Sequence, residues 1–250
     1  MMDYTAYKIE GAHREGQAVI ICDHATNTVP HFVNGGDLGL LETDMQRHIA
    51  YDIGALGVSQ HLAMLLDAPI VSSNFSRLVI DPNRGADDPT RVMRLYDGSI
   101  IPANRHINDT DKNLRSEYCY DPYHDALTHV LAGRADPIIL SIHSFTKQLN
   151  GYAPRPWHVG ILYADDDRLA APLIAACDAH DDICVGDNQP YNGKLTGDTM
   201  DRHALQHGRI HVLIEVRNDL IETEINQKHW AEKLAPIIAQ AIEATLSKET

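Results

Sequence analysis

The stretch Pro137-Ile-Ile-Leu-Ser-Ile142, followed directly by His143, is an apolar run that ends at a histidine. A short continuous run of this kind is typical of a strand buried on both faces of a parallel sheet. Further runs lie at residues 18–22, 70–71, 78–80, 159–163, 183–185 and 210–216. Helical patterns alternate with them at residues 43–66, 123–131, 169–179 and 226–246. This alternation predicts an α/β fold with a mixed, mostly parallel sheet that is flanked by helices.

The composition is that of an ordinary globular protein, and no repeat or linker divides the chain. Of the 250 residues, 44% are hydrophobic and 22% are charged. These values exclude a disordered or fibrous protein. We therefore expect a single domain over residues 1–250, long enough to bury a core without disulfides or a structural metal.

The charge and the distribution of apolar residues argue against several classes of partner. Thirty-five acidic and twenty-one basic side chains give a net charge of −14, which disfavours binding to nucleic acid or anionic lipid. No run approaches the ~20 apolar residues of a transmembrane helix, and the first sixteen residues have no apolar signal core. The four cysteines form no CxxC pair and are typical of reduced thiols in a cytoplasmic protein.

Ionisable side chains follow four of the predicted strands at the point where each strand ends. They are Asp23-His24, Asp81-Pro-Asn-Arg84, His143-Ser144 and, with Glu215 still within the last strand, Arg217-Asn218. In open α/β sheets, ligands bind at the carboxyl ends of the strands. A single histidine at a strand end is more often a structural residue, but four polar strand ends together predict a functional site.

Fifteen histidines in 250 residues prompt a search for a metal site. His24 and His143, with one further N or O ligand, would form a catalytic zinc site with an open position for water. Glu215 would take the proton of that water as it attacks a carbonyl group. An arginine would bind a substrate carboxylate through two hydrogen bonds. The candidates for this role are Arg77, Arg84, Arg202 and Arg217.

Two further features bear on the site. His48 and Asp52 are four residues apart in a predicted helix, so they either face the site or form an intrahelical pair. The polar segments 85–115 and 186–208 are expected to be functional loops that close over a ligand or frame a cleft. The motifs GxGxxG, GxxxxGKS/T and GxSxG are absent, which disfavours dinucleotide binding, P-loop chemistry and a nucleophilic serine.

From about residue 17 to residue 233 the sequence resembles the N-formylglutamate amidohydrolase family. The most specific segments are Ser76-Arg-Leu-Val-Ile-Asp-Pro-Asn-Arg84 and Ile214-Glu-Val-Arg-Asn-Asp-Leu220. The other segments are Asp23-His-Ala-Thr-Asn27, His48-Ile-Ala-Tyr-Asp-Ile-Gly-Ala55, Pro122-Tyr-His124, Ser141-Ile-His-Ser-Phe145 and Arg155-Pro-Trp157.

The resemblance implies a phosphorylase/hydrolase-like fold similar to that of the zinc carboxypeptidases, with an eight-stranded mixed sheet. In that superfamily an HxxE pair and a later histidine bind zinc, and a glutamate on a late strand is the base. His24, His143 and Glu215 match three of these roles, but Asn27 stands where the glutamate of HxxE is expected. The resemblance leaves the third zinc ligand open between His48, Asp52, Asp23 and Asn27, and we favour His48.

The expected activity is that of a zinc-dependent amidohydrolase that removes a formyl or other acyl group from an N-acyl amino acid such as N-formylglutamate. In this interpretation Glu215 is the general base, and Arg84 or Arg217 helps to polarise the carbonyl. Arg77, Asn83, Arg202, Arg217 and Asn218 are the candidates for binding the substrate carboxylate.

Two alternatives remain at this stage. One is a carboxypeptidase- or amidase-like hydrolase of a larger, peptide-like substrate, and the other is a non-catalytic N-acyl amino acid binding protein. The family enzymes of histidine degradation carry a His-Ser/Ala-Gly motif at the first strand, where this chain has His24-Ala-Thr-Asn27. The chain therefore resembles a divergent branch of the family.

Overall fold

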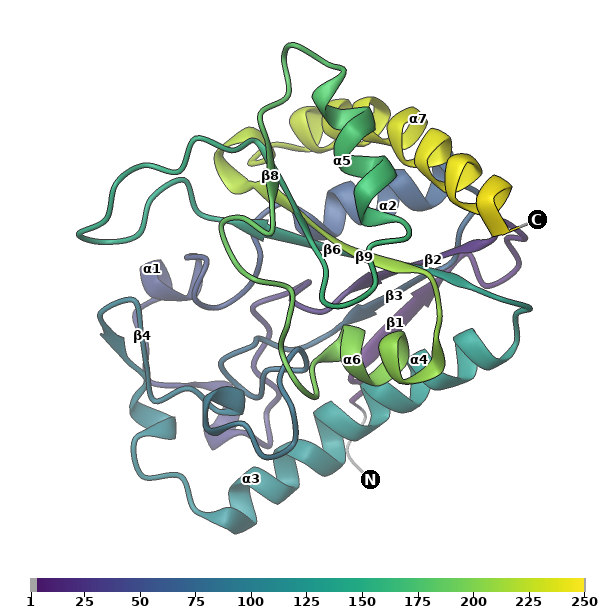
Figure 1. The fold of residues 1–250 in the computed structure, drawn as a ribbon. Helices are drawn as coiled ribbons and strands as arrows, with labels where there is room; N and C mark the ends of the chain where they lie inside the picture. The colour runs from purple at the N-terminus through teal and green to yellow at the C-terminus, as the bar shows by residue number, and fades with distance from the viewer. Residues whose placement is uncertain (1–3, 250) are drawn as a thin grey trace.

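A computed structural model describes residues 4–249 and confirms the α/β class (Figure 1). Within these residues seven strands form one sheet in the order β1-β3-β2-β6-β9-β7-β8, and β4 and β5 form a separate hairpin. The strands are β1 (Tyr7–Glu10), β2 (Ala18–Cys22), β3 (Ile70–Ser73), β4 (Leu95–Tyr96), β5 (Ser99–Ile100), β6 (Ile138–Phe145), β7 (Val159–Leu162), β8 (Val185–Asp187) and β9 (His211–Arg217). The helices are α1 (Glu42–Met45), α2 (Ala55–Leu65), α3 (Asp109–Arg115), α4 (Asp121–Ala132), α5 (Ala170–Asp178), α6 (Thr199–His203) and α7 (Glu224–Glu249).

The sheet is mixed and its centre is parallel. Strands β3, β2, β6 and β9 run parallel to one another. At one edge β1 is antiparallel to β3, and at the other β7 is antiparallel to β9, with β8 parallel to β7. The carboxyl ends of β2, β6 and β9 therefore meet at the same edge of the sheet, which brings the residues that follow them together.

Helices cover both faces of the sheet (Figure 1). Helices α2, α5 and α7 lie on one face, where their buried aliphatic side chains pack on residues of the central strands such as Ile20, Leu140 and Ile214. Helix α4 lies on the opposite face and contributes Tyr123 and Leu127 to a second core. A π-helical turn at Ser116–Tyr120 joins α3 to α4. Because both faces are covered, the central strands are apolar along their whole length.

The prediction of a strand at residues 78–80 is wrong, and the sheet has seven strands rather than eight within the described residues. These residues form turns, although Leu78, Val79 and Ile80 are fully buried. The Asn104 side chain donates a hydrogen bond to the Leu78 carbonyl oxygen, and the Arg115 guanidinium donates one to the Val79 carbonyl oxygen. Side chains thus satisfy backbone groups that a strand would pair within a sheet.

The single helix predicted over residues 43–66 is also wrong, because residues 46–54 interrupt it between α1 and α2. Gly54, just before α2, adopts a φ of 79°, and a Cβ there would lie 2.2 Å from the carbonyl oxygen of Ile221. His48 and Asp52 lie in the interruption, so they do not form an intrahelical pair. The Asp52 amide instead donates a 2.9 Å hydrogen bond to the His24 carbonyl oxygen, which places residue 52 beside the end of β2.

The two long polar segments contain more structure than the sequence suggested. Residues 85–115 include the β4–β5 hairpin and α3, and residues 186–208 include most of β8 and all of α6. The strand predicted at residues 183–185 is observed at Val185–Asp187. No helix within residues 4–249 combines the length and the apolar character needed to cross a membrane.

Candidate metal centre and active site

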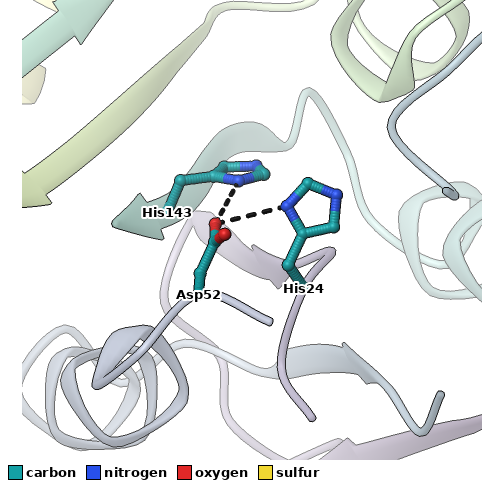
Figure 2. A group of neighbouring side chains, drawn as sticks. All are labelled: His24, Asp52 and His143. Atoms are coloured by element: carbon teal, nitrogen blue, oxygen red, sulfur yellow. Dashed lines mark hydrogen bonds and ion pairs between the residues drawn. The ribbon is translucent and has the colours of Figure 1, made fainter. Parts of the chain in front are cut away.

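Two imidazoles and one carboxylate converge at the carboxyl ends of β2 and β6 (Figure 2). His24 follows β2, His143 lies near the end of β6, and Asp52 comes from the segment before α2. Asp52 Oδ2 lies 3.2 Å from His24 Nδ1 and 2.8 Å from His143 Nδ1. All three residues are buried, with at most 3% of their surface exposed. Each contributes one ligand atom, and these atoms lie within 4.8 Å of one another.

Two further buried aspartates contact the Nε2 atoms of the two imidazoles. His24 Nε2 lies 2.7 Å from Asp81 Oδ1, and His143 Nε2 lies 3.3 Å from Asp23 Oδ2. A carboxylate only accepts hydrogen bonds, so Asp81 and Asp23 each hold a proton on the Nε2 atom that they face. Asp52 Oδ2 faces both Nδ1 atoms and accepts from them in the same way, and a cation bound to Asp52 would replace the Nδ1 protons.

These aspartates are themselves held by hydrogen-bond donors, of which Arg77 is near in the sequence and Tyr123 and Thr199 are distant. Arg77 donates to Asp81 Oδ2 from Nε and Nη2, and its Nη1 lies 3.3 Å from Asp52 Oδ1. The Tyr123 hydroxyl donates to Asp23 Oδ1 at 2.8 Å, and the Thr199 hydroxyl donates to the same oxygen at 3.0 Å.

The charges in this cluster balance one another. Burial alone would raise the pKa of Asp81, but the neighbouring charges of Arg77 and His24 outweigh it and hold that pKa well below its usual value. For Asp52 the same opposition to burial comes from His24 and His143, and the pKa is again lowered. Both carboxylates therefore remain ionised and able to accept hydrogen bonds or bind a cation.

Glu215 lies beside this group on the neighbouring strand. Residues His143 and Glu215 are directly opposite each other in the β6–β9 ladder, and Gly160 of β7 is opposite Glu215 on the other side. The Oε2 atom of Glu215 is buried and has no hydrogen-bond partner within the described residues. Burial raises the pKa of Glu215 to about 7. A buried carboxyl group with one oxygen free of the protein is suited to exchange a proton with a bound molecule.

A small pocket opens onto the group, with a cavity volume of about 170 Å³. Its wall contains His24, Asp52, His143 and Glu215 together with Asn83, Arg84, Asp198, Tyr96, Tyr191, Phe145, Leu162, Leu195 and Leu213. Typical pockets for drug-sized ligands measure ~300–1,000 Å³. The volume suits a compact molecule rather than an extended peptide.

The structure does not bring His48 into the metal-ligand group, although His48 was the favoured third ligand. Its Nε2 atom lies 3.5 Å from Asp97 Oδ2, and the imidazole lines the pocket with its pKa lowered by burial. Asn27 donates a hydrogen bond to the Met45 carbonyl oxygen and lies outside the group. Asp23 approaches His143 from the Nε2 side. Of the four residues considered from the sequence, Asp52 is the one that joins His24 and His143.

The predicted substrate-binding arginines fall into two sets. Arg77 and Arg84 line the pocket, as does Asn83. Arg202 and Arg217 do not line the pocket. The Arg202 guanidinium lies 5.6 Å from the centre of the Tyr120 ring, and Arg217 forms a 2.7 Å ion pair with Asp219. Asn218, which begins a 3-10 turn after β9, does not line it either.

Several residues of the pocket wall were not predicted from the sequence. Tyr96 comes from the β4–β5 hairpin, Tyr191 from the loop after β8, and Asp198 from the residue before α6. Asp198 had one recognisable signal, because its side chain caps α6 by accepting a hydrogen bond from the Asp201 amide. Tyr96 lies in a two-residue strand and Tyr191 in a loop, and no periodic pattern in the sequence marks either of them.

The donor set fits zinc. Two imidazole nitrogens and one carboxylate oxygen are the N and O ligands of a three-residue catalytic zinc site, which keeps a further position for water. The aspartates on the far nitrogens are also typical of metal-binding histidines.

Comparison with known protein families identifies the class of this protein, which is a hydrolase that acts on amide bonds. It belongs to the N-formylglutamate amidohydrolase family, whose model matches residues 16–222 and confirms the resemblance found in the sequence. A search of curated proteins gave no match.

Two solved structures share the fold over nearly the whole chain. A gene product from Agrobacterium tumefaciens is 32% identical, with a TM-score of 0.91, and the alignment covers 96% of each chain. An N-formylglutamate amidohydrolase from Ralstonia eutropha is 20% identical, with a TM-score of 0.59 and 98% of each chain covered. The second similarity shows the fold alone.

Proposed function

We propose that the protein is a metal-dependent amidohydrolase that removes the formyl or another acyl group from a small N-acyl amino acid. The observation that carries this proposal is the convergence of His24, Asp52 and His143 beside Glu215 in one small pocket. Family membership supports amide hydrolysis as the reaction. The metal, the acyl group and the substrate are parts of the proposal.

His24, Asp52 and His143 would hold zinc, with Asp81 and Asp23 accepting the Nε2 protons of the two histidines. A zinc ion bound there supplies a Lewis acid that polarises a carbonyl and lowers the pKa of water. Glu215 accepts the proton of the attacking water and delivers it to the nitrogen of the leaving amine. Its unpartnered Oε2 atom is free for this exchange.

Arg84 is the guanidinium best placed to bind the substrate carboxylate. Arg77 already interacts with Asp52 and Asp81, whereas Arg84 donates to the Asn83 carbonyl oxygen and the Thr90 hydroxyl and has Nη2 free within residues 4–249. We therefore assign Arg84 to the carboxylate rather than to the carbonyl. Positioning by this contact would hold the amide against the group at the sheet edge.

The size of the pocket favours this function over the alternative with a peptide-like substrate. A cavity of about 170 Å³ has room for a short acyl group and one amino acid. The non-catalytic alternative predicts that the protein binds such molecules but neither holds zinc nor turns them over. Asp52 supplies the carboxylate that Asn27 lacks, so the sequence departure at Asn27 gives that alternative no structural support.

The test combines metal analysis with turnover. Protein purified without chelator should contain about one zinc per chain, and formate release from N-formyl amino acids should stop with chelator and return with added zinc. The Glu215→Gln variant should keep its zinc and lose about 10²–10⁴-fold in kcat. The matched control is Glu222→Gln, an exposed glutamate. Zinc-free protein after zinc addition, or full activity in Glu215→Gln, would overturn the proposal.

A further inference from the structure

The pocket has few cations to offer a substrate. Among residues 4–249, Arg77 and Arg84 are the arginines that line it, and no lysine does. Arg77 is held by Asp81 and Asp52, with an Nη2–Oδ2 distance of 2.8 Å to Asp81, so its charge is already neutralised. Arg84 is therefore the cation available for a carboxylate.

The cations beside wall residues do not line the pocket themselves. Arg47 pairs with Asp44 and Asp97, the Lys147 ammonium lies 3.7 Å from Asp219, and the Lys194 ammonium lies 2.9 Å from Asp165. Arg155 donates to the Thr146 carbonyl oxygen and the Tyr191 hydroxyl, with its guanidinium 4.9 Å from the centre of the Tyr191 ring. A substrate with two carboxylates, such as glutamate in an N-formyl derivative, would find a partner for one of them.

Three leucines of the pocket wall, Leu162, Leu195 and Leu213, are called its floor, and they are apolar. In the row of the sheet next to His143, Glu215 and Gly160, the side chains are Ser141, Leu213 and Leu162. Leu213 and Leu162 are 7% and 4% exposed, and both line the pocket. Leu195, which is half-buried, lines it from the loop before α6. An apolar substrate side chain that lies on these leucines is stabilised because it removes apolar surface from water. A charged substrate side chain finds no hydrogen-bond partner on them.

A further acidic residue of the wall, Asp198, disfavours the binding of a second substrate carboxylate. Asp198 is 4% exposed, follows Leu195 by three residues, and lines the pocket. Burial raises the pKa of Asp198 to about 7, so the group is partly ionised at neutral pH. Asp198 accepts a hydrogen bond at the start of α6, and the charge of Arg84 also acts on it. A second carboxylate near Leu195 would be desolvated and repelled.

We propose that the substrate carries a single carboxylate, bound by Arg84, and an apolar or uncharged side chain that lies on Leu162, Leu195 and Leu213. The inference rests on the proposed function and names its substrate class, which differs from the dicarboxylate in the name of the family.

N-formyl-L-glutamine and N-formyl-L-glutamate test it directly, because they have nearly the same shape and differ by one charge. For the zinc-loaded protein, kcat/KM should be higher for the amide by about tenfold or more. N-formyl-L-leucine should be at least as good a substrate as N-formyl-L-glutamine. The same order of affinities is expected in calorimetry with the Glu215→Gln variant, in which binding is measured without turnover.

Replacing a leucine of the floor by arginine would provide a cation for a second substrate carboxylate. Leu195→Arg should raise the ratio of kcat/KM for N-formyl-L-glutamate to that for N-formyl-L-glutamine by about tenfold. The matched control Leu195→Gln, which is polar but uncharged, should leave the ratio within about twofold. An unchanged ratio in Leu195→Arg would overturn the assignment of this surface as the side-chain site.

The two proposals fail in different ways. If wild-type protein hydrolyses N-formyl-L-glutamate as well as or better than N-formyl-L-glutamine, the inference is overturned and the amidohydrolase function stands. If the zinc-loaded protein hydrolyses none of the three compounds, the proposed function is overturned and the inference falls with it.

Discussion

Acidification should destabilise the protein through a buried pair of histidines behind the active site. His124 of α4 and His203 of α6 are stacked, with His124 Nδ1 at 2.8 Å from His203 Nε2. His124 Nε2 lies 3.1 Å from the Pro82 carbonyl oxygen, to which it donates its proton. His124 Nδ1 is then the acceptor, and His203 Nε2 donates to it. Each ring is neutral in this arrangement.

The pKa values of both histidines are depressed in the folded protein. Burial, followed by the neighbouring His203, lowers the pKa of His124 to about 3. Burial, followed by the charge of Arg202, lowers the pKa of His203 to about 4. Between these values and the unfolded value of about 6.5, the unfolded chain binds protons that the folded protein does not. Stability is therefore greatest above pH 6.5 and falls as the pH decreases toward 4.

The expected magnitude follows from the linkage relation. Each histidine contributes a slope that approaches about 1.4 kcal/mol per pH unit well below pH 6.5 and is half of that at pH 6.5, which gives about 1.6 kcal/mol between pH 6.5 and pH 5. The His203→Gln variant keeps a side-chain N–H for His124 Nδ1 and removes one titrating group. The mean slope of its unfolding free energy over this range should therefore be smaller than that of the wild type by about 1 kcal/mol per pH unit.

Urea unfolding of metal-free protein at several pH values between 5 and 6.5 measures this slope, because metal release would add its own pH dependence. The His229→Gln variant, which removes an exposed histidine of α7, is the matched control. Equal slopes for the wild type and His203→Gln would refute the reasoning, whatever the difference in absolute stability.

Three other predictions concern the site and the backbone. Asp81→Asn places an amide beside His24 Nε2, and zinc affinity measured by chelator competition should fall by about 10–100-fold, whereas unchanged affinity would remove Asp81 from the metal site. Arg84→Ala should raise KM for N-formyl amino acids by about tenfold or more with a smaller change in kcat, and an unaltered KM would show that another group binds the carboxylate. Gly54→Ala should lower the unfolding free energy by roughly 3 kcal/mol, because it adds a clash with Ile221 to an unfavourable positive φ. Gly98 has a φ of 83° and open space around it, so Gly98→Ala is the control without a clash. An equal loss of unfolding free energy in the two variants, measured by urea unfolding, would show that the clash with Ile221 is unimportant.

The sequence by itself determined the architecture and half of the site. A strand covered on both faces must be apolar throughout, so the runs that became β2, β6 and β9 are visible without any structure. The carboxyl ends of parallel strands meet at one edge, and His24, His143 and Glu215 could be placed together for that reason. Family motifs over the same residues identified the chemistry.

Tertiary structure alone decided the third member of the candidate metal group. The choice of Asp52 over His48 depends on the break before Gly54 and on the hydrogen bond from the Asp52 amide to the His24 carbonyl oxygen. Apolar content could not separate a buried turn at residues 78–80 from a strand, because Asn104 and Arg115 reach its carbonyl oxygens from elsewhere in the chain. The partners of each arginine were also beyond sequence reasoning. Local pattern reports burial and periodicity, whereas these outcomes depend on contacts between residues that are far apart in the chain.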